Sequence, residues 1–435
     1  MKEVTEDSKD DAPKAEAEKE AGLRKIFKKL GPGLITGASD DDPSGIATYS
    51  QVGAHFGFSM LWTILLSYPL MGAIQEISAR IGRVTGHGIA GNIRKYYSRW
   101  LAFFIVGLMV TANIINIGAD IAAMGSSLKL VIGGPALLYS ALFSFLSIYL
   151  QIFIPYSKYV RYLKWLTMSL FAYIITVMIV KVPWGTTLYN TFVPNFSFNP
   201  YYLTSLIAVL GTTISPYLFF WQASQEVEEI KTNVEDEALK KAPEQATNQI
   251  QRIKVDTYIG MAFSNLVSYF IILASAVTLH AHHITEINTA ADAAAALKPL
   301  AGEFSFLLFS AGIIGTGLLA IPVLAGSAAY AVGEAFRWKI GLEHKPNRAK
   351  NFYAVLALSI ILGLLIDFTP VNPIKALFWS AVINGITAGP VMVMLMLMSG
   401  NRKVMGEFTI SKGLKIIGWI STLVMILASI GLFLT

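Results

Sequence analysis

The sequence lacks cysteine and has few charged residues. None of its 435 residues is Cys, and only 14% are Asp, Glu, Lys or Arg. A chain without cysteine has no disulfide, thiolate zinc site, iron–sulfur cluster or thiol nucleophile, so any metal is held by oxygen, imidazole or thioether groups. It also has no convincing HExxH, P-loop, GxSxG or Ser/His/Asp arrangement. We therefore expect neither an enzyme nor a cofactor.

What the sequence has in abundance is apolar residues, which make up 54% of the chain and give a mean hydropathy of +0.55. The charges are bunched between nearly uncharged runs of about 20 residues, each long enough to cross a bilayer core of roughly 30 Å as a helix. This pattern excludes a soluble protein. The net charge of +6 lies on no basic soluble domain, so nucleic acid is not an expected partner.

The pattern predicts an all-α membrane protein with eleven spans, preceded by a charged and largely disordered tail over residues 1–29. The spans are 33–55, 58–79, 101–125, 132–153, 163–183, 202–222, 255–279, 303–333, 352–367, 373–398 and 413–434.

The basic residues predict how the chain is oriented. Thirty of the 34 Lys and Arg residues fall in the tail and in alternate connecting segments, which by the positive-inside rule are cytoplasmic. We therefore expect a multi-pass plasma-membrane protein with a cytoplasmic N-terminus and with Thr435 outside. The bilayer is its expected environment, and no obligate protein partner is inferred.

Two spans are interrupted in the middle. The first contains Asp40-Asp41-Asp42-Pro43-Ser44-Gly45, and the sixth contains Gly211-Thr212-Thr213-Ile214-Ser215-Pro216. Two breaks five spans apart are typical of inverted five-helix repeats, in which broken helices form a substrate site near the bilayer midplane. We predict a first repeat over 30–183, a second over 201–398 and an eleventh helix over 413–435.

The breaks hold the candidate ligands. A carboxylate at the centre of a membrane span costs at least ~2.5–3.5 kcal/mol, so Asp42 is expected to face a wet cavity or a cation. Asp40 and Asp41 are candidates for an entrance or a relay, or are simply solvated at the outer mouth of the span. Ser215 is either a ligand or a hydroxyl bonded back to its own helix. Pro216 lacks an N–H, which leaves the Thr212 carbonyl free to act as a ligand.

Three other groups of polar residues are weaker candidates. Asp120 in the third span and Asn384 in the tenth either take part in ion passage or only hold helices together. The three histidines after the seventh span could bind a surface metal, but a solvated outer loop explains them better. We expect Glu76 to pair with Arg80 one turn away. The histidines are His280, His282 and His283.

Two stretches resemble a known family. GPGLITGASDDDPSGIATYSQVGAHFGFSMLW is similar to the first helix of the Nramp (natural resistance-associated macrophage protein) divalent-metal transporters, and ISARIGRVTGHGIA is similar to the segment after their second helix. With matching helix order, the resemblance extends over about residues 30–435. It implies the LeuT-like fold, a 5+5 inverted repeat with discontinuous helices 1 and 6.

The resemblance also implies a site, with several departures. Asp42 and Pro43 match the family's first break, whereas Gly45 stands at its Asn position and leaves more space. Thr212 stands where an Ala carbonyl binds metal. The family's ligand Met, the His that follows it and a Gln of the tenth helix are replaced, in that order, by Ser215, Tyr217 and Ala381.

These departures resemble the Nramp-related magnesium transporter branch. Losing the thioether removes a filter against hard cations, and a roomy oxygen site suits an ion such as Mg²⁺, which keeps several waters. We expect uptake of Mg²⁺, and also Mn²⁺, by alternating access, with Asp42, Thr212 and Gly45 oxygens around the ion. Tyr217 at the His position and Ala123 at a relay Glu position predict transport without proton coupling. The alternatives are a proton-coupled Mn²⁺/Fe²⁺ symporter and an amino-acid or other organic-solute transporter of the same fold.

Overall fold

The computed structural model describes residues 36–37, 39–154, 167–233 and 235–434, and within these ranges it contains helices and no strands. The predicted tail over 1–29 and the C-terminal Thr435 lie outside the described residues. Seven helical stretches of the described part are long and apolar enough to cross a membrane. Two shorter apolar helices fall in the predicted fifth and ninth spans.

The predicted spans before the second break all coincide with helices. Spans one to five correspond to α3 (Pro43–Phe56), α4 (Leu61–Thr85), α6 (Arg99–Ile132), α7 (Ala136–Phe153) and α9 (Phe171–Ile179). The start of the first span and part of the fifth lie outside the described residues.

The second half follows the same order. The sixth span is divided into α11 (Pro200–Thr213) and α12 (Pro216–Thr232), and spans seven to eleven are α13 (Ala246–Thr278), α16 (Ser305–Phe336), α17 (Lys350–Ile366), α18 (Pro373–Ser399) and α20 (Lys412–Leu434). The domain limits within this sequence of helices stay a prediction, as does the side of the membrane on which each terminus lies.

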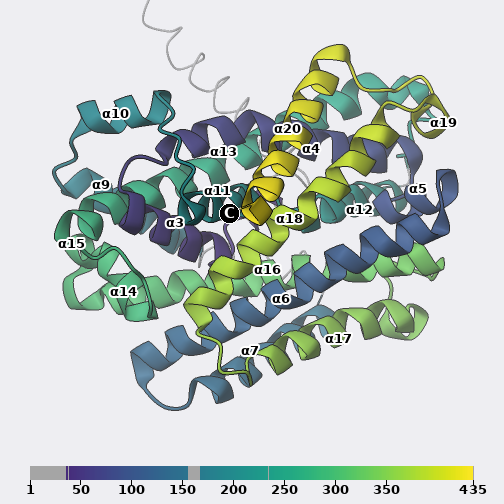
Figure 1. Cartoon of the computed structure of the whole chain (residues 1–435). Helices are drawn as coiled ribbons and strands as arrows, with labels where there is room; N and C mark the ends of the chain where they lie inside the picture. The colour runs from purple at the N-terminus through teal and green to yellow at the C-terminus, as the bar shows by residue number, and fades with distance from the viewer. Residues whose placement is uncertain (1–35, 38, 155–166, 234, 435) are drawn as a thin grey trace, which may run out of the picture.

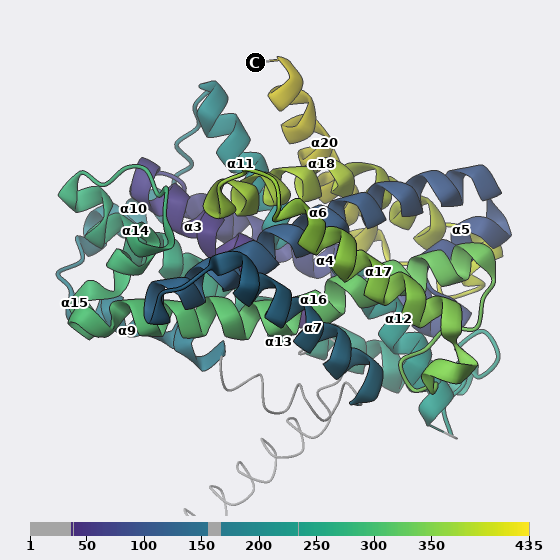
Figure 2. The ribbon, with the colours of Figure 1, turned by 90° about the horizontal axis from the view of Figure 1, so that it is seen from below.

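Helices far apart in the sequence surround the two breaks. α3 packs against α13 and α18, α11 packs against α18, and α6 packs against both α16 and α18. The long helices α6, α16 and α18 cross the molecule obliquely, while α7 and α17 lie together along one edge (Figures 1 and 2). The breaks therefore lie inside the bundle, away from the lipid.

Short helices at the ends of the spans were not predicted. α5 (Ile89–Tyr96) follows α4, and α10 (Trp184–Phe192) precedes α11. α5 buries Ile89, Ala90 and Ile93 on one face and carries basic residues in its last turn. Such short amphipathic helices lack the long apolar run by which membrane spans are recognised.

Candidate functional site

Asp42 occupies the first break and caps the helix that follows it. Its Oδ1 accepts hydrogen bonds from the Ser44 hydroxyl and from the Gly45 N–H, both at 2.7 Å. Pro43 occupies the first position of α3, where a missing N–H leaves no donor unsatisfied. Only 1% of Asp42 is exposed. The sequence Asp-Pro-Ser-Gly thus begins a helix and holds a buried carboxylate at its positive end.

The other oxygen of Asp42 joins two further helices. Its Oδ2 accepts a hydrogen bond from Asn116 Nδ2 on α6 at 2.9 Å, and Asn116 Oδ1 accepts one from the Ser380 hydroxyl on α18 at 2.8 Å. All three residues are buried. Sequence reasoning missed Asn116 and Ser380, although Asn116 lies one helical turn before Asp120 and so on the same face of α6.

The second break exposes the carbonyl of Thr212. The residue four positions on is Pro216, which has no N–H to give to that carbonyl. The Ser215 hydroxyl donates to the carbonyls of both Gly211 and Thr212 at 2.9 Å. Of the two roles considered for Ser215, the structure therefore shows the bond back to its own helix. The Thr212 oxygen keeps a second lone pair for a ligand.

The two breaks touch at Gly45, and this contact corrects one expectation. A Cβ added at Gly45 would lie 2.9 Å from Thr212 Oγ1 and 3.3 Å from Tyr49 Cε2. The room expected from the missing side chain is thus filled by the Thr212 hydroxyl. Gly45 also lies within α3, where a carbonyl is engaged in the helical hydrogen-bond ladder. A carbonyl oxygen keeps a second lone pair after one hydrogen bond, so the role of Gly45 as a carbonyl ligand stays a prediction, as does that of Thr212.

Two other predicted residues lie near Asp42, and a third, Asn384, lies one helical turn after Ser380 on α18. Asp120 on α6 is buried and lies close enough to Asp42 for their charges to interact. Tyr217 in α12 is buried near both carboxylates. The Asp120 carboxylate, the Tyr217 hydroxyl and the side-chain amide of Asn384 on α18 form no hydrogen bond in the described part of the chain. These buried polar atoms, which lack partners, are available to an ion or to its water molecules.

Asp40 and Asp41 do not lie at a solvated mouth, so that alternative is wrong. They are 1% and 2% exposed. Their oxygens accept hydrogen bonds from Ser264 on α13, at 2.6 Å for Asp40 and 3.2 Å for Asp41. Ser268 lies a further turn along the same helix and donates to Asp41 at 3.4 Å. These carboxylates therefore face α13, whereas Asp42 faces α6.

The structure also places Glu76 and the histidines that follow the seventh span. Glu76 forms the predicted ion pair with Arg80. His280 and His282 bond through Nδ1 to the carbonyls of Ala54 and Thr278, at 2.9 and 2.6 Å. Within the described ranges, no group of three or more His, Asp or Glu side chains is arranged to hold a metal. A metal at the breaks would therefore be held by few carboxylates and by neutral oxygens.

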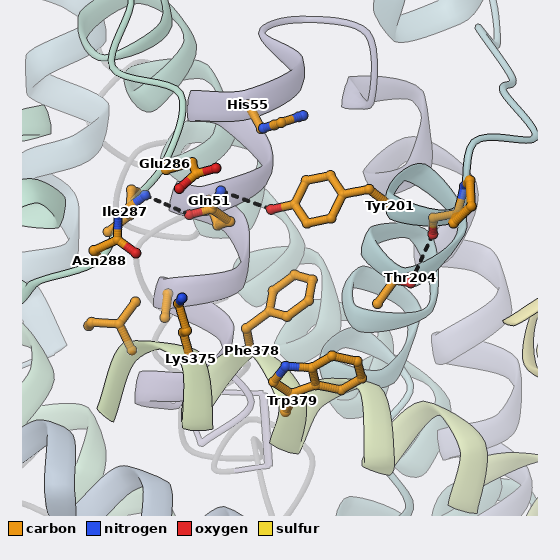
Figure 3. Close-up of a pocket in the computed structure, with 13 residues that line it drawn as sticks. Gln51, His55, Tyr201, Thr204, Glu286, Ile287, Asn288, Lys375, Phe378 and Trp379 are labelled. Carbon is orange, nitrogen blue, oxygen red and sulfur yellow. Dashed lines mark hydrogen bonds between the residues drawn. The ribbon is translucent and has the colours of Figure 1, made fainter. Parts of the chain in front are cut away.

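A pocket of about 560 Å³ lies at the end of α3 that is predicted to face outward. Gln51 of α3 crosses it, donating to the Tyr201 hydroxyl at 3.0 Å and to the Thr285 carbonyl at 3.2 Å. The Ile287 N–H donates to Gln51 Oε1 at 2.9 Å. Figure 3 shows the Gln51 side chain between Ile287 and Tyr201. Gln51 thus ties α3 to α11 and to the segment before α14 (Ala290–Ala294).

Several curated proteins are similar to this chain over most of its length. The divalent metal cation transporter MntH of Mesorhizobium japonicum is 26% identical over 414 residues, which cover 92% of this chain and 86% of that protein. The protein of the same name from Deinococcus radiodurans is 24% identical over 418 residues, covering 93% of this chain and 89% of the relative.

Solved structures share the fold. The Eremococcus coleocola manganese transporter in complex with an aromatic bis-isothiourea compound aligns with a TM-score of 0.72 at 16% identity, covering 98% of this chain and 88% of that one. Mhp1, a nucleobase-cation-symport-1 family transporter, aligns with a TM-score of 0.53 at 13% identity over 93% of this chain and 92% of its own. These likenesses confirm the predicted LeuT-like fold.

The sequence profile of one family matches nearly the whole chain, including both breaks. The profile is described as natural resistance-associated macrophage protein-like, and it matches residues 33–435. Its members are transporters and not enzymes. The chain belongs to the Nramp family.

Proposed function

We propose that this Nramp-family transporter carries divalent metal cations inward by alternating access, with Mg²⁺ and Mn²⁺ as its substrates. The ion binds at Asp42, beside the Thr212 carbonyl, and keeps part of its water shell. The single observation that carries the proposal is the buried Asp42 carboxylate at the first helix break, where a Cβ built on Gly45 would lie 3.5 Å from Asp42 Oδ1 and 2.9 Å from the Thr212 hydroxyl of the second break. The names of the MntH relatives support divalent cations as the class of substrate.

The chemistry of the ligands supports Mg²⁺ within that class. Asp42, Thr212 and Ser215 offer only oxygen, and no sulfur or imidazole group stands at the break positions that they occupy. Hard oxygen ligands suit Mg²⁺ and Mn²⁺, whereas thioether sulfur selects softer ions. Mg²⁺ dehydrates reluctantly and is usually held by one or two carboxylates plus water. The unpartnered groups of Asp120 and Asn384 are suited to hold such water.

Liposome flux measurements test the proposal. Purified transporter in vesicles is given external Mg²⁺ or Mn²⁺, and entry is read from an internal metal-sensitive dye. The Asp42→Asn substitution keeps the size of the side chain but removes its charge, and we expect it to abolish the uptake of both ions. Glu303→Gln removes one acidic charge from an exposed site and serves as the control. Unchanged Mg²⁺ uptake by the Asp42→Asn transporter would refute the assignment.

Proton-coupled Mn²⁺ transport is the second candidate, and Asp120 is the observation that favours it. Its carboxylate is buried, lies near Asp42 and the Ser44 backbone N–H, and forms no hydrogen bond of standard geometry with the described residues. A carboxyl group so placed can release a proton when a cation arrives. Acidification of the vesicle lumen during Mn²⁺ entry, lost in Asp120→Asn, would establish this candidate. We expect no acidification, because Tyr217 and Ala123 stand where the resemblance implies a relay His and Glu.

A further inference from the structure

A second polar cluster lies on the other side of the first break from the Asp42 site. The side chains of Asp40 and Asp41 meet α13, where the Ser264 hydroxyl is within hydrogen-bond distance of Asp40 Oδ2 (2.6 Å) and Asp41 Oδ1 (3.2 Å). One hydroxyl that reaches both carboxylates shows that the two acids converge on one point. The Ser268 hydroxyl lies 3.4 Å from the same Asp41 oxygen.

Two polar atoms in this cluster have no partner. Asp40 Oδ1 and the Tyr49 hydroxyl are buried and form no hydrogen bond with the described part of the chain. Tyr49 is 1% exposed, and its hydroxyl lies near the charges of Asp40 and Asp41 and near the side chains of Ser268 and Thr212, without a hydrogen bond of standard geometry to either. Buried polar groups are almost always satisfied by protein, water or an ion. A phenol oxygen and a carboxylate oxygen are thus available to one ligand.

The charge of the cluster gives the sign of that ligand. Among the described residues, no Lys, Arg or His forms an ion pair with Asp40 or Asp41. A buried carboxylate without a counter-charge is costly, and two neighbouring ones add mutual repulsion. A cation at Asp42 lies on the α6 side and is held by different oxygens, so it does not take up the free atoms of this cluster.

We propose that Asp40 and Asp41 form a second cation site, separate from Asp42, that binds a hard divalent ion. Two carboxylates match the charge of a divalent cation, and hydroxyl oxygens complete the shell. The absence of nitrogen and sulfur among these ligands favours Mg²⁺ or Mn²⁺ over softer metals. The neutral ligands are the hydroxyls of Ser264, Ser268 and Tyr49.

Thr212 connects the two sites. Its Oγ1 lies 2.9 Å from where a Cβ of Gly45 would stand, next to Asp42. The Tyr49 hydroxyl, which belongs to the second cluster, lies near the same Thr212 side chain. The two ions would therefore be separated by one threonine side chain and by the backbone of the break. Occupancy of the second site would hold the break in a fixed geometry before the transported ion binds at Asp42.

The number of bound ions tests the proposal. Equilibrium dialysis of the full chain in detergent against radioactive Mn²⁺ should give two ions per chain for the wild type. We expect one ion for Asp42→Asn, one for the Asp40→Asn/Asp41→Asn double variant and none for the triple variant. A wild type that binds one ion, lost in Asp42→Asn and kept in the double variant, would overturn the second site but leave the proposed function intact.

A conservative pair of variants guards against loss of folding. Ser264→Ala/Ser268→Ala keeps both carboxylates, and we expect it to weaken only the second Mn²⁺ ion by roughly 10–100-fold, as is typical when groups around a metal are removed. Ser275→Ala removes a buried hydroxyl from the same helix, at a place that packs against Gly53, and should bind as the wild type does. If the serine pair and Ser275→Ala give equal Mn²⁺ affinities, a proton rather than a metal neutralises the cluster and the proposal fails.

Discussion

Asn116 should control how tightly the transporter binds its ion, although it is no direct ligand in the proposed site. Its side-chain amide donates to Asp42 Oδ2 at 2.9 Å and accepts from Ser380 at 2.8 Å. Asn116→Ala removes both bonds and frees the Asp42 carboxylate to rotate out of its present orientation. It also leaves the Ser380 hydroxyl without its acceptor on α6.

The size of the effect follows from the kind of bond that is lost. A hydrogen bond to a charged group contributes about 1.5–3 kcal/mol, and about 1.4 kcal/mol corresponds to a factor of ten in affinity. Losing a group that orients a metal ligand typically weakens binding by about 10–100-fold. We therefore expect the Mn²⁺ dissociation constant of Asn116→Ala to rise by about that factor.

Asn113 provides a matched control for this measurement. It is buried on the same helix and donates to the Leu324 carbonyl at 2.8 Å and the Ser327 hydroxyl at 2.9 Å. Asn113→Ala thus also removes two hydrogen bonds from α6 but none from Asp42. Calorimetric titration with Mn²⁺ and thermal unfolding of both variants separate affinity from stability. Equal Mn²⁺ affinities of the two variants would refute the reasoning.

Three further predictions concern the contact between the two breaks, the pocket at Gln51 and the ion pair of Asp236. Gly45→Ala places a Cβ 2.9 Å from Thr212 Oγ1 and should cost about 1–3 kcal/mol of stability. Adding Thr212→Ala removes that hydroxyl and should restore the unfolding temperature. An unfolding temperature that stays low in the double variant would contradict the contact. Gln51→Leu removes the hydrogen bonds that close the pocket at the predicted outer end of α3. Because the chain has no cysteine of its own, a cysteine introduced at Ala47 reports access to this pocket, and an impermeant thiol reagent should label it faster in the Gln51→Leu variant. An unchanged labelling rate would exclude this closure. Burial raises the pKa of the Asp236 carboxyl, but the hydrogen bond and charge of Arg83 outweigh it and hold that pKa below its ordinary value. The ion pair therefore stabilises the fold at pH values above the ordinary pKa of Asp, and this stabilisation is lost as the pH falls through the lowered pKa of Asp236. Asp236→Asn should thus lower the unfolding temperature at neutral pH but not in strong acid. A deficit that does not vary with pH would contradict this.

The sequence predicted the elements of the fold well. Each span was marked by an apolar run, and each break by a proline that lacks an N–H, at Pro43 and at Pro216. These are local properties of the chain, so they can be read without knowing which helices are neighbours. The amphipathic helix α5 (Ile89–Tyr96) was missed because its apolar residues are too few to resemble a span.

The partners of the site residues could not be predicted in the same way. Asp42 was found from its place in an apolar run, but helix packing brings Asn116 to it across 74 positions of sequence and Ser380 to Asn116 across 264. The predicted space at Gly45 was wrong for a related reason, since the Thr212 hydroxyl that fills it comes from the other half of the chain. Residue types predict which atoms a site offers, and packing decides where those atoms point.

The buried Asp42 carboxylate makes the transport cycle depend on the membrane voltage. A negative charge that changes its access from one side of the membrane to the other exchanges about 2.3 kcal/mol with the field for each 100 mV. A divalent ion at Asp42 more than neutralises this buried carboxylate, whereas the empty site retains its negative charge. An inside-negative potential pushes that charge outward. The voltage of the cell would therefore speed the return of the empty carrier as well as attract its cargo.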